Sequence, residues 1–193
     1  MQWLKVTRLD TQEAHFEAKL SQLLGWESVS DQRVQKTVAD IIERIKVQGD
    51  TALLQLTNQL DRTPFKTAAE LEIPQQKLQQ ALADITAQER DALQIAADRI
   101  RAYHAHQKQD SWSYVEADGT LLGQQITPMD RVGIYVPGGK ASYPSSVLMN
   151  AIPAKVAGVK EIIMTVPLPN GKVNPLVLAA AAIAGVDRVF AIG

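Results

Sequence analysis

A glycine-containing turn between a strand pattern and a helix pattern is the segment of this chain best suited to chemistry. Residues 131–136 are rich in β-branched side chains and end at residues 137–139, Pro-Gly-Gly, which predicts a strand and a tight turn. Glycines lack side chains, so backbone N–H groups in such a turn can approach a ligand closely. The next helix is predicted to begin near Ser145 or Ser146, with its positive end facing the turn. Such a unit is typical of an anion site, and an ordinary tight turn is the alternative interpretation.

Tyr135 is the residue of this segment best placed to contact a ligand. It lies at the predicted carboxyl end of the strand, where open α/β sheets bind their ligands. Because side chains alternate along a strand, Tyr135 points away from the face that carries Ile134 and Val136. A tyrosine there can lay its ring against a nucleotide and donate from its hydroxyl, with Pro137 lining the same pocket. The alternative interpretation is a tyrosine packed beneath a neighbouring helix.

Other reactive side chains have simpler explanations. His104 and His106 are two positions apart in a predicted helix and point about 200° apart, which does not suit a shared metal ion. Lys140 follows the glycines and could contact a phosphate, with an exposed turn lysine as the alternative. Ser145 and Ser146 lack a Gly-x-Ser-x-Gly motif, so helix capping is their expected role. We therefore predict no catalytic and no metal-ligating residue in this chain.

Composition excludes several function classes. The 193 residues are 46% hydrophobic and 21% charged with a net charge of −1, so there is no electrostatic case for binding nucleic acid or an anionic membrane. The absence of cysteine excludes disulfides, thiolate metal sites and a cysteine nucleophile. The first residues lack the pattern of a secretory signal, and no window approaches the roughly 18 apolar residues of a membrane span. We expect a cytoplasmic protein.

Two domains of an α/β protein are predicted. Residues 1–128 are expected to form a mainly helical domain with short strands, and residues 129–193 the start of an incomplete Rossmann-like parallel αβ unit, truncated at its carboxyl end. Helices are predicted at residues 34–45, 50–60, from Pro74, and 89–107. Strands are predicted at 71–73, at 112–116 and 120–126 as a hairpin around Asp118-Gly119, and at 131–136, 161–166 and 188–192.

Two apolar helix faces and one open strand edge are also predicted. The first face consists of Val34, Val38, Ile41, Ile42 and Ile45. The second, expected to face inward, consists of Leu93, Ala96, Ala97, Ile100 and Tyr103. Val189–Ile192 is expected at an uncovered sheet edge, which is a template for association.

The segment 131–159 closely resembles the corresponding part of the histidinol dehydrogenases. In that family a strand ending in Tyr-(Ile/Val)-Pro-Gly-Gly leads into a helix close to Ser-(Ser/Thr)-Val-Leu-Met-x-Ala-x-Pro-Ala-x-(Val/Ile)-Ala-Gly. Here these positions are residues 135–139 and 145–158. The resemblance continues through residues 161–167 and 184–193 and, more loosely, 34–60 and 96–107.

This resemblance implies an oxidoreductase of histidine biosynthesis that oxidises L-histidinol to L-histidine. Two NAD molecules each accept a hydride, a zinc ion positions the substrate, and the enzyme is an intertwined homodimer. The resemblance implies that Tyr135 and Pro137 contact NAD. The family's zinc ligands and its proton-moving Glu-His pair belong to a later part of its sequence, so no catalytic or metal residue is assigned here. One departure is Leu60-Asp61, where the family often has Phe-Asp beside the cofactor pocket.

Members of this family are much longer than this chain. We interpret the chain as the amino-terminal part of such an enzyme, inactive alone, with a short natural protein ending on an edge strand as the alternative. Two further hypotheses are a catalytically silent nucleotide-binding module and a helical interaction fragment whose αβ unit is only structural.

Overall fold

The computed structural model describes residues 7–24, 26–138 and 143–193, and only the backbone of residues 26–31. The chain divides into two compact units, residues 1–52 and residues 53–193. The predicted domain boundary at residue 128 stays a prediction.

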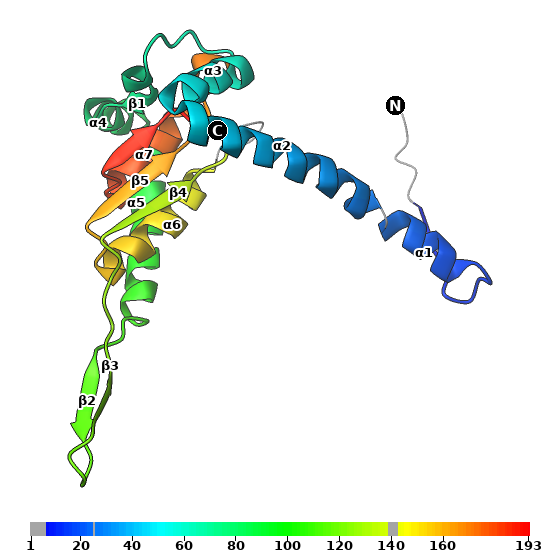
Figure 1. The fold of residues 1–193 in the computed structure, drawn as a ribbon. Helices are drawn as coiled ribbons and strands as arrows, with labels where there is room; N and C mark the ends of the chain where they lie inside the picture. Colours follow the sequence, from blue (N-terminus) through cyan, green and yellow to red (C-terminus); the bar gives the residue numbers. More distant parts are fainter. Residues whose placement is uncertain (1–6, 25, 139–142) are drawn as a thin grey trace. The chain divides into compact units, whose positions relative to one another are not determined.

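The first unit contains the helices α1 (Phe16–Leu24) and α2 (Trp26–Gln48), seen in blue in Figure 1. Helix α2 ends at Gly49, as predicted, and the φ of +56° at this residue favours glycine. Two residues of the predicted apolar face, Val34 and Ile42, are 56% and 48% exposed. The helix is therefore confirmed, while much of its apolar face lies open.

The second unit is built on a four-stranded sheet in the order β1-β6-β5-β4. The strands β4 (Arg131–Tyr135), β5 (Glu161–Thr165) and β6 (Arg188–Phe190) are parallel, and β1 (Glu72–Ile73) is antiparallel to β6. The three predicted parallel strands are thus confirmed, each one or two residues shorter than expected. The α/β fold class is confirmed as well.

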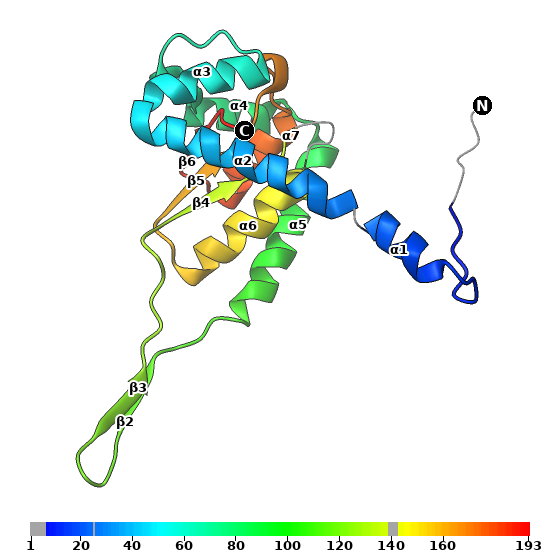
Figure 2. The ribbon, with the colours of Figure 1, turned by 45° about the vertical axis from the view of Figure 1, so that its right-hand side comes forward.

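Helices pack against this sheet in a common core. Helix α6 (Pro144–Ala157) connects β4 to β5, and α7 (Pro175–Ala184) connects β5 to β6. Helix α4 (Gln75–Asp84) packs against α7, and α5 (Ala87–Ala105) lies beside α6, as Figures 1 and 2 show. The largest buried side chains of the core are Leu78, Val136, Val147, Leu148, Ile152, Ile162, Met164, Val166, Val177 and Val189.

The prediction that Val189–Ile192 forms an open sheet edge is wrong. Strand β1 covers that edge, with Glu72 opposite Phe190 and Ile73 opposite Val189. Ala191 extends the pairing by donating its N–H to the carbonyl of Leu71 at 2.7 Å. Within the described part of the chain, the two outermost strands of the sheet are β1 and β4.

Helix α5 is confirmed, although it begins and ends two residues earlier than predicted, and its inward face follows the prediction except at one residue. Thr86 and Glu89 form a capping box at its start, and Ala97 is fully buried. Tyr103, which was expected to face inward, is 64% exposed. It lies in the last turn of the helix, beyond Ile100, the last residue of this face that packs against the core.

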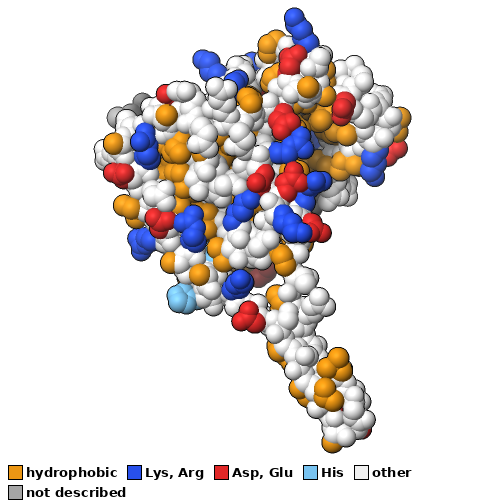
Figure 3. Space-filling model, turned by 90° about the vertical axis from the view of Figure 1, so that its left-hand side faces the viewer, with side chains coloured by type: hydrophobic (Ala, Val, Ile, Leu, Met, Phe, Trp, Pro, Cys, Tyr) orange, Lys and Arg blue, Asp and Glu red, His pale blue; other side chains and the backbone are white. Residues whose placement is uncertain are grey.

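The predicted hairpin is confirmed as β2 (Trp112–Val115) and β3 (Leu121–Gln124), joined through Gly119 at a φ of +92°. All residues of both strands are exposed. Figure 3 shows apolar side chains along this arm. The remaining elements are α3 (Asp50–Asp61) and the short helical turns η1 (Ala68–Leu71) and η2 (Pro169–Gly171). None of the described helices is long and apolar enough to cross a membrane.

Candidate functional site

The carboxyl ends of β4, β5 and β6 meet at one edge of the sheet. Tyr135 lies opposite Thr165, and Thr165 lies opposite Phe190. The pairing continues past the strands, because Val136 donates its N–H to the carbonyl of Thr165 and Val166 to that of Phe190, both at 3.0 Å. The segments that follow the strands are therefore gathered at the edge where parallel sheets bind ligands.

Tyr135 lies on the open face of this sheet. Its side chain is 56% exposed, whereas the next residue, Val136, is fully buried. This is the predicted alternation, and it excludes a tyrosine packed beneath a neighbouring helix. Pro137 is also exposed, so both residues predicted to contact a cofactor are accessible at the end of β4.

Close packing against a neighbouring segment requires a glycine at position 138, which no local sequence pattern predicted. A Cβ at this position would lie 2.5 Å from the carbonyl oxygen of Pro167 and 3.0 Å from its Cγ. The turn after β4 therefore lies directly against the segment after β5. The prediction that its glycines admit a ligand is untested at Gly138, while Gly139 and Lys140 lie outside the described residues.

Helix α6 begins without a serine cap. Pro144 is its first residue and Tyr143 its N-cap, whose side chain makes no capping hydrogen bond to the described residues. The expected capping role of Ser145 and Ser146 is wrong, because proline favours the first helical position and starts the helix before them. Among the described residues, no side chain caps the first amides of α6, which suits an anionic ligand.

A hollow of about 290 Å³ adjoins the turn after β4. It is lined by Gly138, Val166, Pro167, Pro169, Lys172, Val173, Asn174 and Val177. Asn174 caps α7 by accepting a hydrogen bond from the N–H of Leu176 at 2.8 Å. Lys172 is the cationic residue of this lining. The hollow can therefore accommodate a polar or anionic group next to the turn that follows Tyr135.

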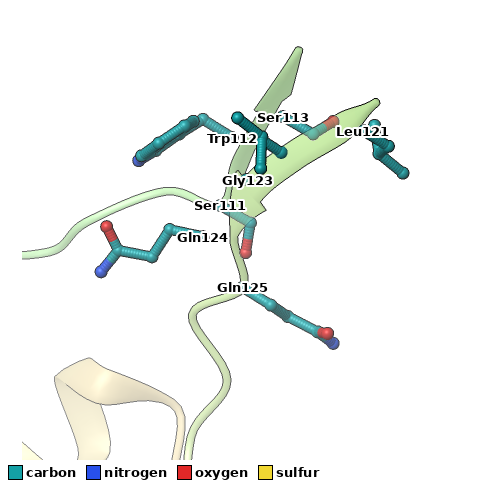
Figure 4. Close-up of a pocket in the computed structure, with 8 residues that line it drawn as sticks. Ser111, Trp112, Ser113, Leu121, Gly123, Gln124 and Gln125 are labelled. Carbon is teal, nitrogen blue, oxygen red and sulfur yellow. The ribbon is translucent and has the colours of Figure 1, made fainter. Parts of the chain in front are cut away.

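A larger hollow, of about 410 Å³, lies on the hairpin (Figure 4). The side chains of Trp112 and Leu121 point to opposite sides of the hairpin in Figure 4. No charged residue is among those that line it, namely Ser111, Trp112, Ser113, Leu121, Leu122, Gly123, Gln124 and Gln125. Without an acid, a base or a cation, this hollow offers no catalytic chemistry, and we place the candidate site at the sheet edge.

A metal site does not fit the residues that the structure describes. Among them no group of three His, Cys, Asp or Glu side chains could hold a metal ion. His104 lies in the last turn of α5, with its Nδ1 2.6 Å from Oε1 of Gln107, and His106 follows as the C-cap. The helical placement predicted for His104 is thus confirmed.

Similarity to known proteins decides which family this fold represents. The family model described as histidinol dehydrogenase matches residues 26–193. The chain belongs to the histidinol dehydrogenase family. The resemblance inferred from the segment after residue 131 is therefore confirmed, and the family is one of NAD-dependent oxidoreductases of histidine biosynthesis.

Individual histidinol dehydrogenases show which part of the family the chain represents. That of Pseudomonas syringae pv. tomato is 60% identical over 188 residues, which are 97% of this chain and 42% of the relative. That of Pseudomonas aeruginosa is 56% identical, with coverages of 97% and 43%. The chain spans about two fifths of these curated relatives and corresponds to their amino-terminal portion.

A solved structure supports the fold. The crystal structure of histidinol dehydrogenase from Elizabethkingia anophelis superimposes with a TM-score of 0.75 at 30% sequence identity. The match covers 83% of this chain and 36% of that protein. The arrangement of sheet and helices described above is thus shared with a histidinol dehydrogenase.

Proposed function

We propose that this chain is the amino-terminal, nucleotide-binding part of a cytoplasmic histidinol dehydrogenase, which oxidises L-histidinol to L-histidine with NAD. The observation that carries the proposal is the exposed Tyr135 at the carboxyl end of β4, within a segment that belongs to this family.

Three features of this edge favour a nucleotide. The ring of Tyr135 offers an accessible flat surface, and Pro137 lies exposed two residues beyond it. The amino-terminal end of α6 is positive and has no side-chain cap within the part of the chain that the structure describes, which favours a phosphate. When bound, NAD supplies the hydride acceptor, while these residues hold and orient the nucleotide.

The topology of the sheet favours the same place. The chain runs from β4 to β5 to β6 in one direction across the sheet, and β4 has no further strand on its outer side among the described residues. In a doubly wound sheet the order of strands reverses beside such a strand, and dinucleotides bind at that reversal. Tyr135 lies at the carboxyl end of this strand.

In this proposal, the zinc ion and L-histidinol bind to residues outside this chain. The described residues hold no cluster suited to a metal, so the rest of the longer protein supplies the zinc ligands, the acid–base residues and the contacts with L-histidinol. The active enzyme is a homodimer. The chain alone is inactive, because it contributes the nucleotide part of the site only.

The experiment that tests this function compares the 193-residue chain with the full-length protein that carries it. NADH formation from L-histidinol with added zinc is followed for both. Turnover is expected from the full-length protein and none from the chain. Zinc-dependent turnover by the pure chain, or an inactive full-length protein that is folded and loaded with zinc, would contradict the proposal.

A further inference from the structure

We propose that Asp61 is a positioning residue for the nucleotide pocket, acting through the backbone of Leu168. The N–H of Leu168 donates to Oδ2 of Asp61 at 2.9 Å, although 107 positions separate the two residues. The carboxylate thereby fixes the loop between β5 and α7, which lines the hollow next to Gly138, in the turn that follows Tyr135. This inference rests on the proposed function, since it gives Asp61 a part in binding the same nucleotide.

Leu168 is the fixed point of this loop. Its side chain is 8% exposed, and a backbone N–H in such surroundings must be paired. Asp61 accepts from that N–H, and the carbonyl of Leu168 accepts from the N–H of Gly171 at 2.8 Å. Both polar groups of Leu168 are therefore bonded, one to α3 and one to the turn η2.

Pro167, the residue before Leu168, links the position of Leu168 to the pocket by close packing. Pro167 lies between two glycines: a Cβ on Gly138 would be 2.5 Å from its carbonyl oxygen, and a Cβ on Gly193 would be 2.7 Å from its Cβ. Such close packing leaves no room for Pro167 to shift by itself. A displaced Leu168 therefore moves Pro167 against the turn that follows Tyr135 and Pro137.

The end of α3 is built to hold Asp61 in place. The side chain of Asn58 donates to the carbonyl of Phe65 at 2.7 Å and accepts from the N–H of Phe65 at 3.1 Å. The hydroxyl of Thr63, which is buried, donates to the same side chain at 2.8 Å. These bonds fold the chain back just after Asp61 and fix the direction of the helix end.

Helix stability does not explain a carboxylate at this position. Asp61 is the last residue of α3, and the negative end of a helix disfavours an anion there. The hydrogen bond to Leu168 offsets this cost, because a hydrogen bond to a charged group is stronger than one between two neutral groups.

The test uses steady-state kinetics of the full-length protein. Asp61→Ala removes the acceptor and is expected to raise the KM for NAD about tenfold, with kcat and the KM for L-histidinol little changed. Asp61→Asn keeps an oxygen acceptor and is expected to raise the KM for NAD only about threefold. A role in folding alone would lower stability without this selective effect on NAD.

Asp84→Ala is the matched control. It removes a carboxylate at the last residue of another helix, α4, where Oδ1 accepts from the side chain of Gln80 at 2.7 Å, and is expected to leave the KM for NAD unchanged. An unchanged KM for NAD in Asp61→Ala overturns the proposal. If Tyr135→Ala still raises that KM, the proposed function stands without it; if neither variant does, both fall.

Hydrogen exchange of the Leu168 amide tests the contact without any cofactor. In the 193-residue chain, this amide is expected to exchange faster in Asp61→Ala than in the wild type or in Asp84→Ala. If the alanine variant does not fold, Asp61→Asn keeps the test open, because its Leu168 amide should also exchange faster. Unchanged exchange in that variant overturns the proposal.

Discussion

The carboxylate of Glu72 accepts two hydrogen bonds of 2.9 Å from the guanidinium of Arg188, which fasten β1 to β6 across 116 positions of sequence. The same guanidinium lies 4.9 Å from the centre of the Phe190 ring. Paired, nearly parallel hydrogen bonds of this kind fix geometry as well as adding attraction. Strand β6 is thus covered by β1, and β4, which carries Tyr135, is the outermost strand at the other edge of the sheet that the structure describes.

The pair of Glu72 and Arg188 makes the stability of the sheet depend on pH in the acid range. The hydrogen bond from Arg188 lowers the pKa of Glu72 below its ordinary value of 4.5. Because the folded-state pKa is the lower one, the stabilisation is present above about 4.5 and is lost as the pH falls through the lowered value. Glu72→Gln is expected to lower the melting temperature at neutral pH, by a difference that shrinks in acid.

Thermal unfolding of wild type and Glu72→Gln across this range measures the effect. Glu116→Gln, at the end of the exposed hairpin, is the control and should follow the wild type at every pH. A difference for Glu72→Gln that stays constant down to strongly acid pH would show that the carboxylate contributes nothing through its charge.

Gly138→Ala tests the close packing of the two turns. A Cβ would lie 2.5 Å from the carbonyl oxygen of Pro167, so the backbone must shift, at a cost of about 1–3 kcal/mol of unfolding free energy. Gly133→Ala is the control on the same strand, because its Cβ would meet nothing within 4 Å. Chemical denaturation measures the unfolding free energy of both variants. Equal stability of the two would contradict the close packing of the turns.

Asp187 is expected to stabilise the fold through its half-buried carboxylate. Its Oδ2 accepts from Nζ of Lys155 and from the N–H of Ile162, both at 2.7 Å. Asp187→Ala leaves that amide without its acceptor and should cost roughly 1–3 kcal/mol of unfolding free energy. Asp130→Ala removes an exposed ion pair with Lys160 and should cost about 0–1 kcal/mol. Denaturant titration that ranks the two in the opposite order would contradict this role.

Local patterns predicted most of the regular structure. The parallel strands alternate or are continuously apolar over several residues, and α5 has both a cap and a long apolar period, so each carries its signal within its own sequence. The placement of Tyr135 at the end of β4 followed from the same alternation. Its accessibility is confirmed by the structure, whereas its contact with NAD stays a proposal.

Contacts between distant segments could not be predicted in this way. Strand β1 has two residues, and its partner β6 lies more than a hundred positions away. No local pattern therefore predicts that Arg188 donates to the carboxylate of Glu72. The bond between Asp61 and Leu168 has the same character. Tyr103 fits the helical period but lies past the end of the packed core. Where the packed core ends depends on the lengths of the neighbouring elements, which the local pattern of one helix does not show.

The role of Tyr135 is tested by the KM for NAD of the full-length protein carrying Tyr135→Ala. Loss of a stacking, hydrogen-bonding aromatic costs about 1–3 kcal/mol, so this KM should rise roughly tenfold to a hundredfold while the KM for L-histidinol changes little. Tyr135→Phe should behave nearly as the wild type if the ring carries the contact. Because the side chain is 56% exposed, the melting temperature should hardly change. An unchanged KM for NAD in the folded alanine variant would contradict the placement of the nucleotide at this edge of the sheet.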